Sequence, residues 1–207
     1  MGTSESRTSS TENLNGTELR PRDVLSNEDR QDVAGSPILI NLGAGDRHLN
    51  GFINVDMADN WCKKSPDVAA DISKTLPFPD EYADEIHAYH VVEHFYRYHI
   101  DDILIDWIRV LKPGGKMVLE MPCLDKIILL FNHYVERKKA PDTRMTLWGL
   151  YGDPTYHNSA MCHRWCYSGA ELRWMLEQKG LTVEFGKPQT HQPMRDMRVE
   201  GIKNARG

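Results

Sequence analysis

The sequence INLGAGDRHLNGFINVD, residues 40–56, constrains the fold more than any other stretch of this chain. A nearly continuous apolar run leads into Gly43 and Gly45, and a second apolar run ends at Asp56. Apolar runs of this length are typical of buried strands in a parallel sheet. In an open sheet, ligands lie beyond the carboxyl ends of the strands, so we expect the two glycines and Asp56 at a binding site.

Strand and helix patterns alternate from Pro37 to the end of the chain. Such alternation predicts an α/β fold, namely a doubly wound, mostly parallel sheet with helices on both faces. The predicted strands are residues 37–43, 52–57, 85–92, 116–122, 181–185 and 197–202, with a further strand ending near Asp71. The predicted helices are residues 101–112, 124–139 and 168–180.

Two of the predicted helices are defined by the spacing of their apolar residues. In residues 101–112 these recur every three or four positions, and Pro113 then stops the helix. The same spacing in residues 124–139 predicts a buried face. The two faces consist of Ile103, Leu104, Trp107, Ile108 and Leu111 in the first helix, and of Ile127, Ile128, Phe131 and Val135 in the second.

Length and composition predict one domain, residues 36–207, preceded by a polar tail at residues 1–35. The tail contains no aromatic residue and cannot bury enough apolar surface to order itself, so we expect it to be disordered. The net charge of −5 argues against dedicated nucleic-acid binding, and no apolar run reaches the length of a membrane span. Four scattered cysteines and the lack of a secretory signal favour a cytoplasmic protein.

Acidic residues after two of the predicted strands indicate which ligand the glycine loop binds. Asp56 can accept hydrogen bonds from both hydroxyls of a ribose, and Asp71 can accept one from an adenine amine. The third glycine of the dinucleotide-binding pattern is missing, because Arg47 and His48 stand there, which disfavours a nicotinamide oxidoreductase. A ribose and an adenine without a pyrophosphate indicate S-adenosylmethionine.

Four motifs between residues 37 and 121 resemble those of the class I S-adenosylmethionine-dependent methyltransferases, in particular the type 11 subgroup. INLGAGD resembles the glycine-rich first motif, and NVD resembles the ribose-binding acid. ADISKTLPFPDEYADEIHAYHVVEHF resembles the segment with the adenine-binding acid, and RVLKPGGKMVLEMP resembles the fifth strand with its preceding turn. The resemblance implies a Rossmann-like sheet of seven strands in the order 3-2-1-4-5-7-6, with the last strand antiparallel. It assigns cofactor binding to Asn41, Gly43, Gly45, Asp56, Met57, Asp71, Ile72 and His90.

Only DRHLNGF separates Gly45 from the second strand, so we expect a single turn or a loop where the family has its first helix. This compact layout is similar to that of small methyltransferases associated with surface-polysaccharide biosynthesis. The similarity extends to LYGDPTYHNSAMCHRWCYSGAEL, residues 150–172. The breakers and polar aromatic residues of residues 142–167 predict a binding loop for a small-molecule or saccharide acceptor. The predicted acceptor contacts are Tyr151, His157, His163, Arg164 and Trp165.

Methyl transfer to an oxygen atom would also require a general base. The predicted catalytic residues are His90, at the end of the strand at residues 85–92, and His94. The alternative is that both histidines only pack the wall of the pocket.

Two further alternatives concern the kind of protein and the need for a metal. A methyltransferase-like domain that has lost catalysis would serve as a binding module, although the cofactor motifs are all present. The cysteines and histidines of residues 157–166 are too loosely spaced to indicate zinc, so no metal site is predicted.

Overall fold

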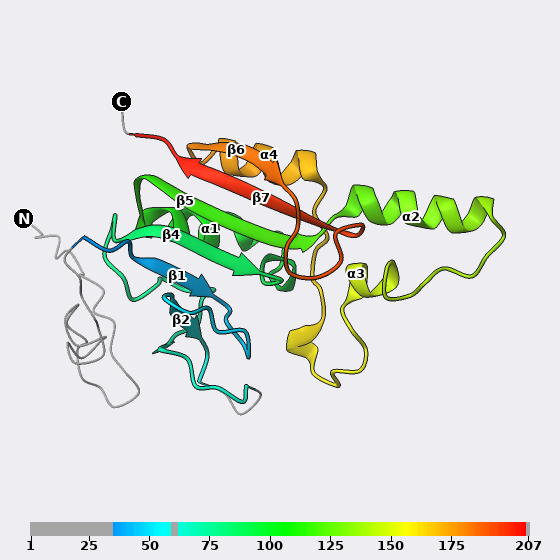
Figure 1. Ribbon diagram of the computed structural model, residues 1–207, viewed down its shortest axis with the longest axis horizontal. Coiled ribbons are helices and arrows are strands. Elements are labelled where there is room, and N and C mark those ends of the chain that lie inside the picture. The colour runs from blue at the N-terminus through cyan, green and yellow to red at the C-terminus, as the bar shows by residue number, and fades with distance from the viewer. Residues whose placement is uncertain (1–34, 59–61, 206–207) are drawn as a thin grey trace, which may run out of the picture.

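The computed structural model describes residues 35–58 and 62–205, so nearly all of the predicted tail lies outside the described residues. These residues form a seven-stranded sheet with the order β3-β2-β1-β4-β5-β7-β6 (Figure 1). Strands β1 to β5 run parallel, and β7 is antiparallel to both of its neighbours. The predicted strand order and antiparallel last strand are thereby confirmed. The strands are β1 (Leu39–Leu42), β2 (Ile53–Asp56), β3 (Val68–Ala69), β4 (Ala83–Tyr89), β5 (Leu111–Pro122), β6 (Leu181–Gly186) and β7 (Asp196–Lys203).

The helix predicted at residues 101–112 ends earlier than expected, because Leu111 belongs to the following strand. Helix α1 spans Ile100–Val110, and Leu111 pairs with Ala83 of β4. Pro113 explains the early end, since a proline has no N–H to donate and disfavours helical geometry in the residue before it. Leu111 is nevertheless fully buried, as its apolar character predicts.

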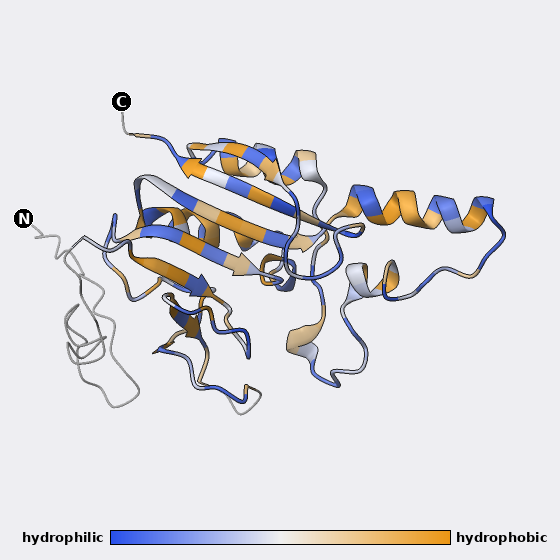
Figure 2. Ribbon diagram, viewed as in Figure 1, coloured by the Kyte–Doolittle hydropathy of each residue, from blue (hydrophilic) through white to orange (hydrophobic). Residues whose placement is uncertain are grey.

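The two faces of the sheet differ in polarity. Helices α1 and α4 (Gly169–Glu177) lie behind the sheet in the view of Figure 1. Ile86 of β4 is fully buried and belongs to the same hydrophobic cluster as Trp107 of α1. Neighbouring positions such as His87 carry polar side chains, so the strands alternate in colour in Figure 2. The main hydrophobic core therefore lies between the sheet and these two helices.

Helix α2 (Leu124–Glu136) projects beyond the sheet and lacks the predicted buried face (Figure 1). Ile127 is buried, but Ile128 and Val135 are 49% and 71% exposed, and Phe131 is half-buried. The prediction was wrong because apolar spacing identifies one face of a helix but not whether another element packs against it. Despite these exposed apolar side chains, no helix among the described residues is long and apolar enough to cross a membrane.

Short helical turns and a capped helix position the remaining functional segments. The 3₁₀ turn η1 (Val92–His94) follows β4 directly. Helix α3 (Leu147–Tyr151) and the turn η2 (Ser159–Met161) belong to the long segment between α2 and α4. Helix α4 begins with the predicted cap, because the Ser168 hydroxyl accepts a hydrogen bond from the Glu171 N–H at 3.1 Å.

Candidate active site

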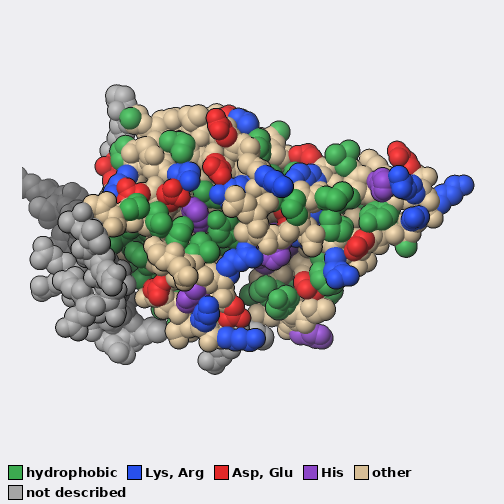
Figure 3. All heavy atoms as spheres, viewed as in Figure 1, with side chains coloured by type: hydrophobic (Ala, Val, Ile, Leu, Met, Phe, Trp, Pro, Cys, Tyr) green, Lys and Arg blue, Asp and Glu red, His purple; other side chains and the backbone are tan. Residues whose placement is uncertain are grey.

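A cavity of about 490 Å³ lies at the carboxyl ends of β1 and β4. Its wall combines the glycine loop after β1, the end of β4, the segment between α2 and α4, and the loop between β6 and β7. Figure 3 shows the surface hollowed in this region, with basic and histidine side chains around the hollow. The volume lies within the roughly 300–1,000 Å³ typical of small-molecule sites.

The first glycine of the loop is required by close packing. Gly43 has a φ of +66°, and its N–H donates to the Val55 carbonyl at 2.9 Å. A Cβ at this position would lie 2.4 Å from Cγ2 of Val91. Gly45 also has a positive φ, +49°, but a Cβ there would meet nothing within 4 Å. The loop therefore packs tightly at Gly43 and has open space beside Gly45.

Two buried asparagines hold the chain between β1 and β2, where only turns are present, as predicted. Asn41 donates through Nδ2 to the Arg47 carbonyl at 2.9 Å and to Oδ1 of Asn54 at 3.0 Å. The same Asn54 oxygen accepts a hydrogen bond from the Leu49 N–H at 2.8 Å, and Asp67 accepts from Asn54 Nδ2 at 2.8 Å. This network replaces the missing helix, and sequence reasoning identified Asn41 but not Asn54 or Asp67.

Asp56 ends β2 beside the glycine loop. Its Oδ2 accepts a hydrogen bond from the Gly45 N–H at 2.7 Å, and its Oδ1 accepts one from the Met57 N–H at 2.7 Å. A carboxylate oxygen can accept two hydrogen bonds, so each oxygen keeps one lone pair for a ligand. The carboxylate is thus oriented by backbone groups and can still bind two ribose hydroxyls.

Asp71 lies two residues beyond β3, close to the expected strand end. Its Oδ1 accepts hydrogen bonds from the N–H and the hydroxyl of Ser73, at 2.9 and 2.6 Å. The next residue, Ile72, is fixed through its carbonyl, which accepts from Nε1 of Trp107 at 3.0 Å. Among the residues predicted to bind the cofactor, the cavity wall includes Asn41, Gly43 and His90, whereas Gly45, Asp56, Met57, Asp71 and Ile72 are not part of it.

His90 follows β4 in an unusual backbone conformation. Its φ is +56°, and its N–H donates to the Glu120 carbonyl at 2.7 Å. Such a conformation in a residue with a side chain costs on the order of 1–3 kcal/mol and is common at functional sites. The kink follows the last residue of the strand directly and accompanies a side chain that lines the cavity.

The His90 imidazole lies between two buried carboxylates. Nδ1 is 3.0 Å from Oε1 of Glu93, and Nε2 is 3.5 Å from Oδ2 of Asp196. Burial alone would lower the pKa of His90, but the interactions with Asp196 and Glu93 outweigh it and raise the pKa to about 9. A ring that is protonated near neutral pH has no free lone pair, which favours a role as hydrogen-bond donor over one as general base.

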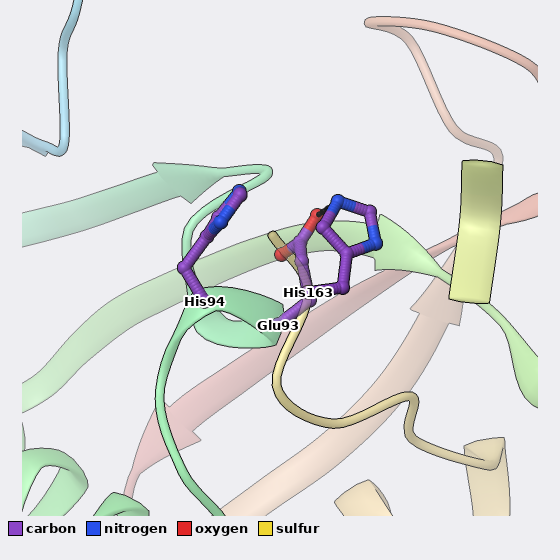
Figure 4. A group of neighbouring side chains, drawn as sticks. All are labelled: Glu93, His94 and His163. Carbon is purple, nitrogen blue, oxygen red and sulfur yellow. Dashed lines mark ion pairs between the residues drawn. The ribbon is translucent and has the colours of Figure 1, made fainter. Parts of the chain in front are cut away.

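Glu93 and His94 of η1 lie beside His163 from the segment before α4 (Figure 4). The three ligand atoms lie within 4.8 Å of one another, which makes this group a candidate metal site. Burial lowers the pKa of His163 despite the attraction of Glu93, so the neutral ring is favoured. In that form Nδ1–H donates to the Gly149 carbonyl at 2.9 Å, and Nε2 keeps its lone pair.

The cysteines near His163 do not join this group. Cys162 is exposed, and Cys166 is half-buried with Sγ 3.9 Å from the Pro122 carbonyl. Burial raises the pKa of the Cys166 thiol to about 12, and a protonated thiol is a poor metal ligand.

The structure places the five predicted acceptor contacts in different surroundings. His163 lines the cavity, whereas Arg164 stacks on Tyr96 at 5.1 Å and Trp165 is 42% exposed, with Nε1 3.4 Å from Glu171. Tyr151 and His157 are also exposed and absent from the cavity wall. Tyr156, another aromatic residue of the predicted binding loop, also lines the cavity. Sequence reasoning did not single out four further side chains of that wall, of which the first two belong to the predicted loop and the last two to the loop before β7: Arg144, Trp148, His191 and Arg195.

The loop between β6 and β7 is anchored to the sheet at Glu120 of β5. This carboxylate accepts hydrogen bonds from the Gln189 N–H at 2.9 Å and from the Thr190 N–H and hydroxyl at 2.9 and 2.6 Å. Burial would raise the pKa of Glu120, but these bonds and one from Arg198 at 2.8 Å hold it below its usual range. Arg47 of the glycine loop donates to the Thr190 carbonyl at 3.3 Å, which links both sides of the cavity.

Residues 45–119 match the protein-family model described as a methyltransferase domain. No curated protein sequence matches the chain significantly. Among solved structures, the chain is similar to an S-adenosylmethionine-dependent methyltransferase from Archaeoglobus fulgidus. The two are 19% identical over 82% of this chain and 87% of that one, with a TM-score of 0.54.

Two further structures show the same likeness. A methyltransferase from Methanosarcina mazei is 15% identical over 82% of this chain and 93% of its own, with a TM-score of 0.55. Human N-acetylserotonin methyltransferase, solved with S-adenosylmethionine, is 14% identical over 82% of this chain and 48% of its own, with a TM-score of 0.53. At these identities the likeness shows the fold, and the family match supports a class I S-adenosylmethionine-dependent methyltransferase. The open space at Gly45 and the free lone pairs of Asp56 fit that cofactor.

Proposed function

We propose that this chain transfers a methyl group from S-adenosylmethionine to a small-molecule or saccharide acceptor. The observation that carries the proposal is the shared cavity, whose wall includes Gly43 from the cofactor side and Trp148, Tyr156 and His163 from the segment between α2 and α4. Methyl transfer requires donor and acceptor to meet in line, and a shared cavity holds both in that geometry.

The protein's own residues would mainly position the two reactants. Bound S-adenosylmethionine supplies an activated methyl group, so little covalent chemistry is required of the protein. Asp56 would accept the ribose hydroxyls, and Asp71 the adenine amine. Protonated His90 would donate a hydrogen bond to Glu93 and form an ion pair with Asp196 beside the cavity. His94 remains the predicted general base.

The composition of the wall supports a polar acceptor of limited size. Trp148 and Tyr156 offer aromatic faces on which a sugar can stack, and Arg144 can orient a hydroxyl or an anionic group. The compact glycine loop, similar to that of methyltransferases associated with surface polysaccharides, favours a saccharide. Tyr151, His157, Arg164 and Trp165 would contact only an acceptor that extends beyond the cavity.

A thermal-shift measurement tests the cofactor assignment. S-adenosylmethionine or S-adenosylhomocysteine at about 100 times its dissociation constant should stabilise the chain by about 2.7 kcal/mol, whereas NAD should not. If neither adenosyl ligand raises the melting temperature at millimolar concentration, the chain would instead be the inactive binding module.

A screen for methylated products by mass spectrometry tests the acceptor class. Sugars, oligosaccharides and small hydroxylated acids would be incubated with the enzyme and isotopically labelled S-adenosylmethionine, with Asp56→Ala as the control for background methylation. Labelled product from a sugar or another small molecule supports the proposal. Label found solely on protein or nucleic acid would contradict it.

We further propose that the enzyme works in a reducing compartment such as the cytoplasm. Cys62, Cys123, Cys162 and Cys166 are all free thiols, which supports this assignment.

A further inference from the structure

Glu93, His94 and His163 form a group whose donor atoms converge from two segments. Glu93 and His94 belong to η1, whereas His163 follows η2. Figure 4 shows the Glu93 carboxylate beside the His163 ring, with the His94 ring rising from the same turn of chain as Glu93. Nε2 of His163 is 4.0 Å from Oε1 of Glu93.

Two atoms of this group are buried without a hydrogen-bond partner. Glu93 is 1% exposed, and its Oε1 interacts with His90, but its Oε2 has no partner among the described residues. Nδ1 of His94 is likewise buried and unpartnered. A buried polar atom without a partner is costly, most of all on a carboxylate, and such atoms commonly mark an ion or a water. A bound cation would satisfy both atoms.

The surroundings orient the donors as they do in metal sites. The Gly149 carbonyl accepts from His163 Nδ1, which leaves the Nε2 lone pair directed at the group. His90 orients the Glu93 carboxylate in the same way, since its Nδ1 is 3.0 Å from Oε1, whereas Oε2 has no partner within the described part of the chain. Partners of this kind fix the tautomer of a ligating histidine and the direction of a ligating carboxylate.

The two segments are also joined through the backbone. The Glu93 carbonyl accepts hydrogen bonds from the N–H groups of Arg164 at 2.7 Å and Trp165 at 3.2 Å. His163 is therefore held against η1 by its own chain neighbours, and the spacing of the donors does not depend on a flexible loop tip.

We propose that Glu93, His94 and His163 bind a divalent transition-metal ion, with Zn²⁺ as the ion that fits best. Two imidazoles and one carboxylate form a donor set typical of zinc sites that leave a fourth position open. Ligand bonds of about 2.0–2.2 Å would bring the donors to roughly 3.3 Å from one another. Because these atoms already lie within 4.8 Å of one another, each pair would close in by about 1.5 Å or less. His94 and His163 line the cavity, so the open position faces the space proposed for the acceptor. With the ion bound, the lone pair of His94 would be occupied, so His94 would serve as a ligand in place of the role of base, and an acceptor oxygen would coordinate the ion.

Zinc titration of the untagged chain of 207 residues tests this site. After dialysis against a chelator, Zn²⁺ would be added in competition with a chromophoric chelator, and the bound zinc counted by mass spectrometry. We expect one tight site per chain, weakened at least 10-fold in His163→Ala and in His94→Ala. Circular dichroism would verify that each variant is folded, and Glu93→Gln, which preserves the shape of the side chain, would serve if an alanine variant unfolds.

Matched controls separate this site from other zinc-binding groups. His157→Ala removes an exposed histidine of the same segment, and Cys162→Ser removes the nearby exposed thiol. Both should bind zinc as the unaltered chain does. Absence of a stoichiometric site, or equal weakening by either control, would overturn the proposal. S-adenosylhomocysteine binding measured on the same samples distinguishes that failure from a failure of the proposed function.

Discussion

The two sides of the cavity are built in different ways. On the side proposed for the cofactor, all of the predicted binding residues except His90 lie between Asn41 and Ile72. They are positioned by strand ends, glycines and backbone N–H groups. On the acceptor side, the wall is assembled from the end of β4, the segment between α2 and α4, and the β6–β7 loop, and it consists of large side chains. A site fixed by backbone geometry should tolerate few substitutions, whereas a site made of side chains can change its ligand by substitution. This contrast indicates that the cofactor is a fixed property of the fold and the acceptor a variable one.

Replacing Gly43 by alanine should have the largest effect, because the cofactor side depends on backbone geometry. The new Cβ would lie 2.4 Å from Val91 at a φ of +66°. Overpacking and left-handed strain together should lower the free energy of unfolding by about 2–4 kcal/mol. Urea denaturation measures the change.

Gly45→Ala is the matched control, since it shares the positive φ but has no atom within 4 Å of the new Cβ. Its free energy of unfolding should fall by only roughly 1–2 kcal/mol. Equal losses in the two variants would mean that packing against Val91 does not fix the loop.

Asp56→Ala should weaken S-adenosylhomocysteine binding by roughly 10- to 100-fold, since hydrogen bonds to a charged group contribute about 1.5–3 kcal/mol. Asp71→Ala should weaken S-adenosylhomocysteine binding by a smaller factor, because the adenine amine can donate to water in place of the missing carboxylate. Isothermal titration calorimetry measures both dissociation constants. An unchanged constant for Asp56→Ala, with the fold intact, would remove the ribose assignment.

On the acceptor side, His163→Ala should leave S-adenosylmethionine affinity within about twofold but reduce acceptor turnover by about 10-fold or more, equivalent to about 1.4 kcal/mol. The neighbouring Arg164 side chain stacks on Tyr96 outside the cavity. Arg164→Ala should therefore retain turnover of a small acceptor. Steady-state kinetics with the acceptor found in the screen compares them. If His163→Ala lost cofactor affinity as well, the two sides of the cavity would not be separable.

Deletion of residues 1–33 should have the smallest effect, because their composition offers little apolar surface to bury. Calorimetry should find the S-adenosylhomocysteine dissociation constant within about twofold of the full chain. A large loss of affinity would show that the cofactor side extends to the N-terminal segment.

The fold could be predicted from the sequence because its signals are local. The apolar runs that end at Leu42 and Asp56 each lie within a few residues of the groups they position. The strand order came from the family resemblance that the motifs carry, and the observed sheet has that order. Helix α2 was misjudged, since the exposure of Ile128 and Val135 depends on what lies opposite the helix rather than on its own pattern.

The sequence names candidate residues for both sides of the cavity, and their roles stay predictions. The cavity wall includes Asn41, Gly43 and His90 of the predicted cofactor residues, and His163 of the five predicted acceptor contacts. His163 was found because an aromatic and histidine-rich segment is visible in the sequence. Glu93 was not, since its partners His90 and His163 come from the strand end before it and from a distant loop. His191 and Arg195 enter the cavity through a loop without any motif, and nothing in their local sequence predicts this position.

The shortness of β3 has a consequence for how the protein opens. This strand has two residues and lies at the edge of the sheet, paired on one side with β2, whereas β5 has twelve residues and a partner on each side. We expect the amide protons of so short an edge strand to exchange with solvent through local opening, whereas those of β5 should exchange only when the whole domain unfolds. Asp71 follows that edge, so an adenosyl ligand held by Asp56 and Asp71 would act as a clamp across β2 and β3. Slower hydrogen exchange at Val68 and Ala69 would then report occupancy of the site directly, without knowledge of the acceptor.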